Sequence, residues 1–117
     1  MLVNEGLPNY LVERLKEKIN LGKMAAGILG MAFKANSDDA RDSLSFKLRK
    51  LLEMEAREVY CSDPYVKRNY FISAEKLIRK CDVVIVGAPH DVYKKLKIGR
   101  DKVLVDVWNL YKRGGRI

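Results

Sequence analysis

The segment that most constrains the fold of this chain runs over residues 27–48. It starts with an apolar run that ends at Phe33, continues through a polar turn over residues 34–39, and then shows leucines at helical spacing, at positions 44, 48, 51 and 52. This order predicts a buried strand, a long turn and a helix. In open α/β sheets, ligands bind where the carboxyl ends of strands meet helix N-termini. The turn is therefore the first place to expect a binding site.

Strand-like and helical patterns alternate along the chain of 117 residues. The apolar runs predict strands over residues 24–33, 58–63, 82–88 and 103–108. The periodic segments predict helices over residues 7–20, 41–55, 73–80 and 91–96. The third strand is almost wholly apolar, as is typical of a parallel strand covered on both faces. We therefore expect an α/β fold: a three-layer, Rossmann-like parallel sheet with helices on both faces, preceded by an N-terminal helix.

The charge balance favours anionic partners, because the formal net charge is +8. The basic residues are scattered, however, and no aromatic platform interleaves with them, so a nucleic-acid surface is disfavoured. No apolar run approaches the roughly 20 residues of a membrane span, and the first residues lack the pattern of a signal peptide. We therefore expect no membrane association and a cytoplasmic location.

Few residues suggest metal or nucleophilic chemistry. Cys61 and Cys81 lie in or beside strand-like runs without metal-ligand spacing, which favours small buried hydrophobes. One histidine and two separated cysteines cannot make a zinc site of the usual kind, so no metal is expected. His90 has no acidic or nucleophilic partner at a recognisable spacing, which favours a structural role. The sequence therefore offers no catalytic residue.

Two further features leave alternatives open. Gly27 and Gly30 stand three apart, but the third glycine of a GxGxxG dinucleotide motif is missing. Close packing of a strand on a helix is therefore favoured over a pyrophosphate site. Asp63 ends the second strand, where an acid can hold a ribose in a dinucleotide-binding fold. The run Asp-Pro-Tyr-Val that begins there is equally typical of a turn.

Several local motifs agree with one family. The turn AFKANSDDARDS is similar to the signature A-F-K-x-x-x-x-D-x-R-x-S, and residues 60–66 loosely match V-x-x-Y-D-P-x-V. Ala88-Pro89-His90 follows the apolar third strand as the T/A-x-H turn of that family does. The chain therefore resembles the C-terminal UDP-binding domain of the UDP-glucose/GDP-mannose dehydrogenases, most of all the UDP-N-acetyl-hexosamine dehydrogenases. Those enzymes oxidise the C6 alcohol of a nucleotide sugar to a carboxylate with two NAD molecules.

The resemblance implies roles for three residues of the turn. Phe33 and Lys34 would contact the UDP-sugar substrate, and Arg41 would reach toward the NAD cofactor at a domain interface. A lysine suits a diphosphate or a sugar hydroxyl, and the fork of an arginine suits a phosphate or a carboxylate. The alternatives are two solvated surface cations, or pairing of Arg41 with Asp38 or Asp42.

The family pattern is missing at two places. Many members have an arginine two residues after the aspartate that ends the last strand, here Asp106, and this chain has Trp108 there. Asp106 and Asn109 remain candidates without that arginine. The GxGxxG motif of the NAD domain and the Gly-Gly-Pro-Cys motif of the catalytic cysteine are also absent. Hydride transfer would therefore need the N-terminal NAD-binding domain and the central domain of such an enzyme.

The first 20 residues are similar to the end of the long central helix of the family. We therefore expect residues 1–22 to be the end of that connecting helix and residues 23–117 to form the UDP-sugar-binding domain. Because the family dimerises through this helix, and Leu11, Leu15 and Ile19 are expected to be exposed on it, a homo-oligomer is a further hypothesis.

The expected function is binding of a UDP-sugar as part of an NAD-dependent UDP-sugar 6-dehydrogenase. The chain alone is expected to bind nucleotide at most, without NAD and without dehydrogenase activity. One alternative is a stand-alone regulatory module that binds a nucleotide. A less favoured alternative, which rests on the net charge, is a basic nucleic-acid-binding protein.

Overall fold

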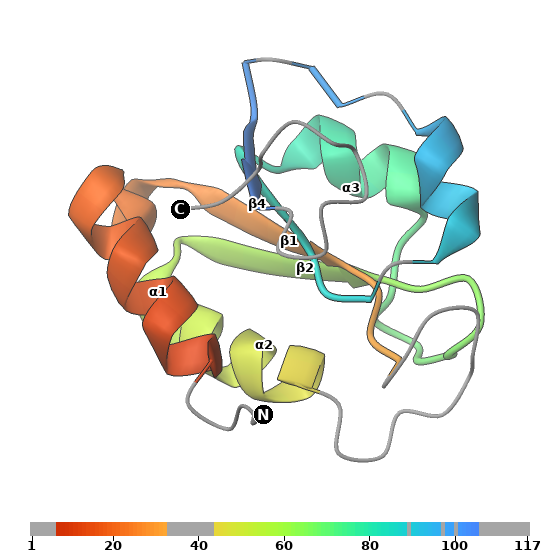
Figure 1. Cartoon of the computed structure of the whole chain (residues 1–117), viewed down its shortest axis with the longest axis horizontal. Helices are drawn as coiled ribbons and strands as arrows, with labels where there is room; N and C mark the ends of the chain where they lie inside the picture. The colour runs from red at the N-terminus through yellow and green to blue at the C-terminus, as the bar shows by residue number, and fades with distance from the viewer. Residues whose placement is uncertain (1–6, 33–43, 89, 97, 100, 106–117) are drawn as a thin grey trace.

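The structure is a computed structural model that describes residues 7–32, 44–88, 90–96, 98–99 and 101–105 (Figure 1). Helical and strand elements alternate over these ranges. The helical elements are α1 (Leu7–Lys18), η1 (Leu21–Lys23), α2 (Leu44–Glu55), α3 (Ala74–Lys80) and η2 (Asp91–Lys95). The strands are β1 (Ala25–Leu29), β2 (Glu58–Ser62), β3 (Val83–Val86) and β4 (Val103–Val105).

The four strands form one parallel sheet in the order β2-β1-β3-β4. β1 lies between β2 and β3, so that Gly27 is level with Tyr60 on one side and with Val84 on the other. After β1 the chain first forms β2 on one side of it. It then crosses to the other side of β1 to form β3 and β4. The predicted Rossmann-like parallel sheet is confirmed.

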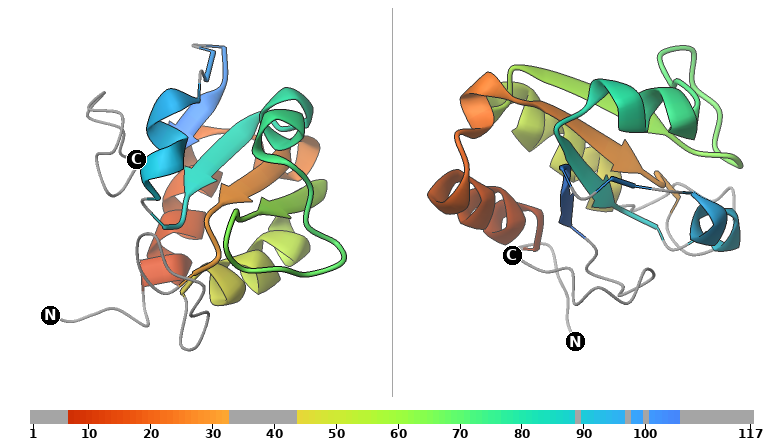
Figure 2. Two further views of the ribbon diagram at one scale, coloured as in Figure 1. Left: turned by 90° about the vertical axis from the view of Figure 1, so that its right-hand side faces the viewer. Right: turned by 90° about the horizontal axis from the view of Figure 1, so that it is seen from above.

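Helices cover both faces of the sheet, as Figures 1 and 2 show. α1 and α2 pack on one face, where Ala26 and Ile28 of β1 join their buried leucines in one core cluster. α3 and η2 pack on the other face, where Leu29 meets Leu77 and Tyr93. Successive side chains of a strand point to opposite faces. β1 is therefore buried along its whole length.

The element boundaries differ from the predicted ones for local reasons. β1 ends at Leu29 and not at residue 33, because Gly30 has φ +98° and turns the chain out of the sheet. The predicted helix over residues 91–96 is a 3-10 helix. α3 begins as predicted, with the Ser73 Oγ accepting a hydrogen bond from Lys76 N at 3.2 Å. Residues 41–43 and 106–108 of the predicted elements lie outside the described residues.

The expectation of an exposed stripe on the first helix is wrong. Leu11 is 6% exposed and Leu15 is 1% exposed, because α1 packs on α2 and joins the core of the sheet. Ile19 packs partly buried against the same core. Lys16 Nζ also lies 3.4 Å from Glu55 Oε1 of α2. This stripe therefore gives no support to self-association.

The two cysteines behave as small buried hydrophobes, as the sequence predicts. Cys61 and Cys81 are free thiols, 1% and 0% exposed. Burial raises the pKa of Cys61 to about 11 and that of Cys81 to about 12. Both thiols are therefore protonated and unreactive near neutral pH. None of the described helices is long and apolar enough to cross a membrane.

Candidate functional site

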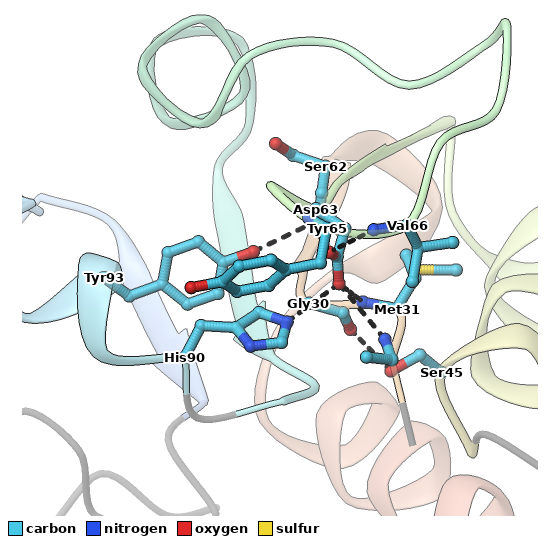
Figure 3. Close-up of polar contacts among 10 residues, drawn as sticks. Gly30, Met31, Ser45, Ser62, Asp63, Tyr65, Val66, His90 and Tyr93 are labelled. Atoms are coloured by element: carbon cyan, nitrogen blue, oxygen red, sulfur yellow. Dashed lines mark hydrogen bonds and ion pairs between the residues drawn. The ribbon is translucent and has the colours of Figure 1, made fainter. Parts of the chain in front are cut away.

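The carboxyl ends of β1, β2 and β3 meet at one buried carboxylate, that of Asp63 (Figure 3). Asp63 directly follows β2. Its Oδ2 accepts hydrogen bonds from Met31 N at 2.6 Å and Ala32 N at 3.1 Å, just beyond β1. Its Oδ1 accepts from Tyr65 N at 2.7 Å and Val66 N at 2.8 Å, which closes the turn after β2. One side chain therefore joins two strand ends that adjoin in the sheet.

His90, which comes after β3, completes this arrangement. Its Nε2 lies 2.9 Å from Asp63 Oδ2, and both side chains are fully buried. The imidazole contacts the rings of Tyr65 and Tyr93, whose centroids lie 4.8 and 5.4 Å from its own. Tyr93 in turn donates its hydroxyl to Ser62 O at 3.3 Å. We call Asp63, His90 and the four backbone donors the Asp63 network.

The hydrogen bonds determine the proton positions in this network. Both oxygens of Asp63 already accept backbone N–H groups, so the carboxyl group is ionised and the His90 Nε2 donates to it. Burial by itself raises the pKa of Asp63. The hydrogen bonds from His90 and from the N–H groups of Val66, Met31 and Tyr65 outweigh that effect and lower the pKa below its usual value.

These findings decide two alternatives that the sequence left open. Asp63 closes a turn and is buried with its acceptor positions used, so it does not offer a free carboxylate to a ribose. His90 has the buried position of a structural histidine, yet it does have an acidic partner, 27 residues earlier in the chain. Sequence spacing missed the pair. The available signal was that Asp63 ends one predicted strand and His90 follows the next.

Close contacts between backbone segments hold the strand ends beside this network. Gly30 N donates to Ser62 O at 2.8 Å, and Gly87 N donates to Leu29 O at 2.7 Å. Ser45 Oγ, at the start of α2, donates to Gly30 O at 2.7 Å. A Cβ on Gly30 would lie 2.6 Å from Ala88 N. The turn after β1 is therefore packed against the turn after β3.

Gly27 and Gly30 do not form an open glycine-rich loop. A Cβ on Gly27 would collide with the Leu77 side chain and would lie 2.7 Å from Cys81 Sγ, so this glycine faces α3. Gly30 likewise packs directly against Ala88 and leaves no space for a side chain. Neither glycine therefore leaves its backbone open to a pyrophosphate, and close strand–helix packing, the favoured interpretation of Gly27, is confirmed. Nor do three His, Cys, Asp or Glu side chains gather as metal ligands within the described ranges.

A cavity of about 430 Å³ adjoins the Asp63 network, between the connection from β2 to α3 and η2. Asp63 forms part of its lining, and Phe71, Val92 and Tyr93 supply apolar wall. Lys67 and Arg68 are the cations among its lining residues. The Arg68 guanidinium lies 5.3 Å from the centre of the Phe46 ring. The volume is in the range of sites for small molecules.

The residues to which the resemblance gave roles lie outside the described residues. This holds for Phe33, Lys34 and Arg41 in the turn after β1, and for Asp106, Trp108 and Asn109 beyond β4. The structure does describe residues on either side of the segment that contains the turn. Ala32 is bonded to Asp63, and Ser45 is bonded to Gly30.

Comparison with known sequences decides the family. The sequence profile of the UDP-glucose/GDP-mannose dehydrogenase family, UDP binding domain, matches residues 27–113. The chain belongs to this family. It is 29% identical to the UDP-N-acetyl-D-mannosamine dehydrogenase of Pyrococcus horikoshii over 121 residues. This alignment covers 94% of this chain and 29% of the relative. The corresponding protein of Methanocaldococcus jannaschii is 30% identical over 125 residues, 95% of this chain and 29% of the relative.

Solved structures confirm the fold of this UDP binding domain. A UDP-glucose dehydrogenase from Pyrobaculum islandicum superposes with a TM-score of 0.76 at 30% identity, over 97% of this chain and 27% of that one. The UDP-N-acetyl-mannosamine dehydrogenase of Staphylococcus aureus gives a TM-score of 0.80 at 25% identity, over 97% of this chain and 30% of that one. The chain thus spans less than a third of the length of these dehydrogenases.

Proposed function

We propose that this chain binds the UDP-sugar substrate of an NAD-dependent UDP-sugar 6-dehydrogenase. The observation that carries the proposal is the match of the family's UDP binding domain over residues 27–113. The names of the first two relatives favour a UDP-N-acetyl-hexosamine as the sugar nucleotide. In this proposal residues 1–22 are the end of a connecting helix and residues 23–117 are the binding domain.

The binding residues we propose are Phe33 and Lys34. They come directly after Ala32, which Asp63 holds at the carboxyl end of β1. This is the edge of a parallel sheet at which open α/β folds bind their ligands. A lysine ammonium at this edge would neutralise part of the charge of the diphosphate.

Oxidation of the sugar needs groups that we assign to other domains of the enzyme. The sequence has neither the GxGxxG motif for NAD nor the Gly-Gly-Pro-Cys motif for the thiol. Arg41 would reach the cofactor from this side of the domain interface. We therefore propose that the chain alone binds nucleotide but has no dehydrogenase activity and does not bind NAD.

Calorimetric titration of the chain with UDP tests the proposal, with UDP-N-acetylglucosamine and NAD as parallel ligands. We expect saturable binding of UDP, no binding of NAD, and weaker UDP binding by Lys34→Ala. Lys18→Ala is the matched control, because it removes one cation from the last turn of α1. Equal weakening by both substitutions would indicate a general charge effect and would contradict a site at Lys34.

The same titration, with duplex DNA as a further ligand, separates the alternatives. If the wild-type chain does not bind UDP, the proposal that this domain binds nucleotide alone is wrong. Binding of duplex DNA in place of UDP, with an affinity that falls steeply as salt rises, would favour a nucleic-acid-binding protein. UDP binding without any loss in Lys34→Ala would favour a nucleotide module whose site lies elsewhere in the chain.

A further inference from the structure

The Asp63 network joins segments that are far apart in the sequence. Asp63 accepts from Met31 and Ala32 after β1, from Tyr65 and Val66 in its own turn, and from His90 after β3. The bonds to β1 and β3 span between 27 and 32 residues of sequence. Because Met31 N and Ala32 N both donate to Oδ2, the carboxylate helps to fix the chain directly after β1.

The bond from Ala32 to Asp63 lies immediately before the proposed binding residues. Ala32 is the last described residue before Phe33 and Lys34. The side chains of Asp63 and His90 are both 0% exposed, so neither presents its polar atoms at the surface. Their effect on a ligand would have to pass through the backbone that they hold.

His90 contributes orientation as well as a hydrogen bond. The Nε2 donor meets the same oxygen, Oδ2, that accepts from Met31 and Ala32. Edge contacts with Tyr65 and a tilted contact with Tyr93 limit the rotation of the imidazole. Loss of the donor would let the carboxylate rotate and would loosen the two N–H bonds beyond β1.

We propose that Asp63 and His90 are a positioning pair, which sets the backbone at Met31 and Ala32, directly before the proposed binding residues Phe33 and Lys34. This inference rests on the proposed function for its ligand, and on the contacts above for its geometry. It assigns to the pair a specific effect on nucleotide affinity, beyond the stability that any buried hydrogen bond contributes.

Four variants separate positioning from stability. Asp63→Asn places an amide NH2 against backbone N–H donors, and His90→Leu removes the Nε2 donor while keeping bulk. His90→Gln retains a donor near the Nε2 position and is the conservative rescue. Tyr93→Phe is the matched control, because it removes the hydrogen bond to Ser62 O and leaves the Asp63 network intact.

Two measurements are made on each variant at a temperature where circular dichroism shows it to be folded. Amide hydrogen exchange by NMR reports on Met31 and Ala32 without any ligand. We expect exchange at these two amides to accelerate in Asp63→Asn and His90→Leu and to stay near the wild-type rate in His90→Gln and Tyr93→Phe. Calorimetry should show the UDP dissociation constant raised about tenfold or more in the first two variants and little changed in the other two.

Each outcome is decisive for one claim. Unchanged exchange at Met31 and Ala32 in both disruptive variants overturns the positioning pair. Faster exchange with unchanged UDP affinity also overturns it, because the backbone then moves without effect on the ligand. A loss of affinity in Tyr93→Phe equal to that in His90→Leu would reduce the effect to stability and would refute the proposal. If the wild-type chain binds no UDP, the proposed function fails, and the exchange data alone decide whether the pair fixes this backbone.

Discussion

Asp63 is an acidic side chain in a place that usually excludes charge. Burial of an ionised carboxylate is costly unless its lone pairs accept hydrogen bonds. Here four backbone N–H groups and the His90 Nε2 supply them. Bonds to an ionised acceptor are stronger than neutral ones, and those of Asp63 are mostly short. The folded state therefore stabilises the ionised carboxylate over the protonated form.

The stability of the chain should depend on the ionisation of Asp63. Since its pKa is lowered in the folded state, the carboxylate contributes stability that is present above the unfolded-state pKa of about 3.9 and is lost as pH falls through the folded-state value. We expect the free energy of unfolding, measured by urea denaturation, to fall below about pH 4. Asp63→Asn should be less stable at neutral pH and should show a smaller fall in acid.

The control for this prediction removes a carboxylate that is not part of the network. Glu17 forms a surface pair with Arg14 at 3.8 Å and is 66% exposed. Glu17→Gln should leave the pH profile close to that of the wild type, because exposed pairs contribute little. If Asp63→Asn and the wild type have parallel profiles down to about pH 2, the role we assign to this carboxylate is wrong.

At the scale of elements, the alternation of strands and helices follows from local pattern, and so it was predictable. The run of valines in β3 and the cap at Ser73 are read directly from adjacent residues. The end of β1 was not predictable from apolarity, because the apolar run of the sequence continues to Phe33 while Gly30 turns the backbone. The Asp63–His90 contact could not be read either. It depends on β2 and β3 flanking β1. The other four donors to Asp63 are backbone N–H groups, which residue type does not identify.

Packing of β1 on α3 depends on a missing side chain at Gly27. A Cβ there would overlap Leu77 and approach Cys81 Sγ. We expect Gly27→Ala to lower the free energy of unfolding by about 1–3 kcal/mol, since core overpacking forces neighbours to shift. Chemical denaturation of the variant and of the wild type measures this difference in the free energy of unfolding. Gly22→Ala is the matched control, because its Cβ would lie 3.6 Å from Glu55 O, an ordinary contact, and its stability should be unchanged or slightly raised.

At the scale of the whole molecule, α1 belongs to the same hydrophobic core as the sheet and α2. Leu15 is 1% exposed and shares a core cluster with Ile28 of β1 and Leu52 of α2. The resemblance placed α1 at the end of a connecting helix, and its amphipathic stripe was recognisable in the sequence. The surface that the stripe covers was not, because that surface is assembled from α2 and the sheet.

Leu15→Ala tests whether α1 and the sheet unfold together. We expect a loss of about 2–5 kcal/mol, as for other buried leucines, and the same lowered midpoint for amide signals of α1 and of β1. Urea titration followed by NMR provides both probes. If the midpoint of β1 stays at the wild-type value while that of α1 falls, α1 is an independent appendage and the shared core is not cooperative.

The hydrogen bond from Ser45 to Gly30 has a consequence for how such domains diversify. It joins two residues fifteen positions apart, so the two ends of the segment between them lie close together. Lengthening a segment whose ends are already held together costs little free energy of loop closure, about 0.6 kcal/mol for each doubling of its length. This segment contains Phe33, Lys34 and Arg41. Under the proposed function, natural variation or laboratory grafting in this segment would alter ligand preference, while the strands keep their register.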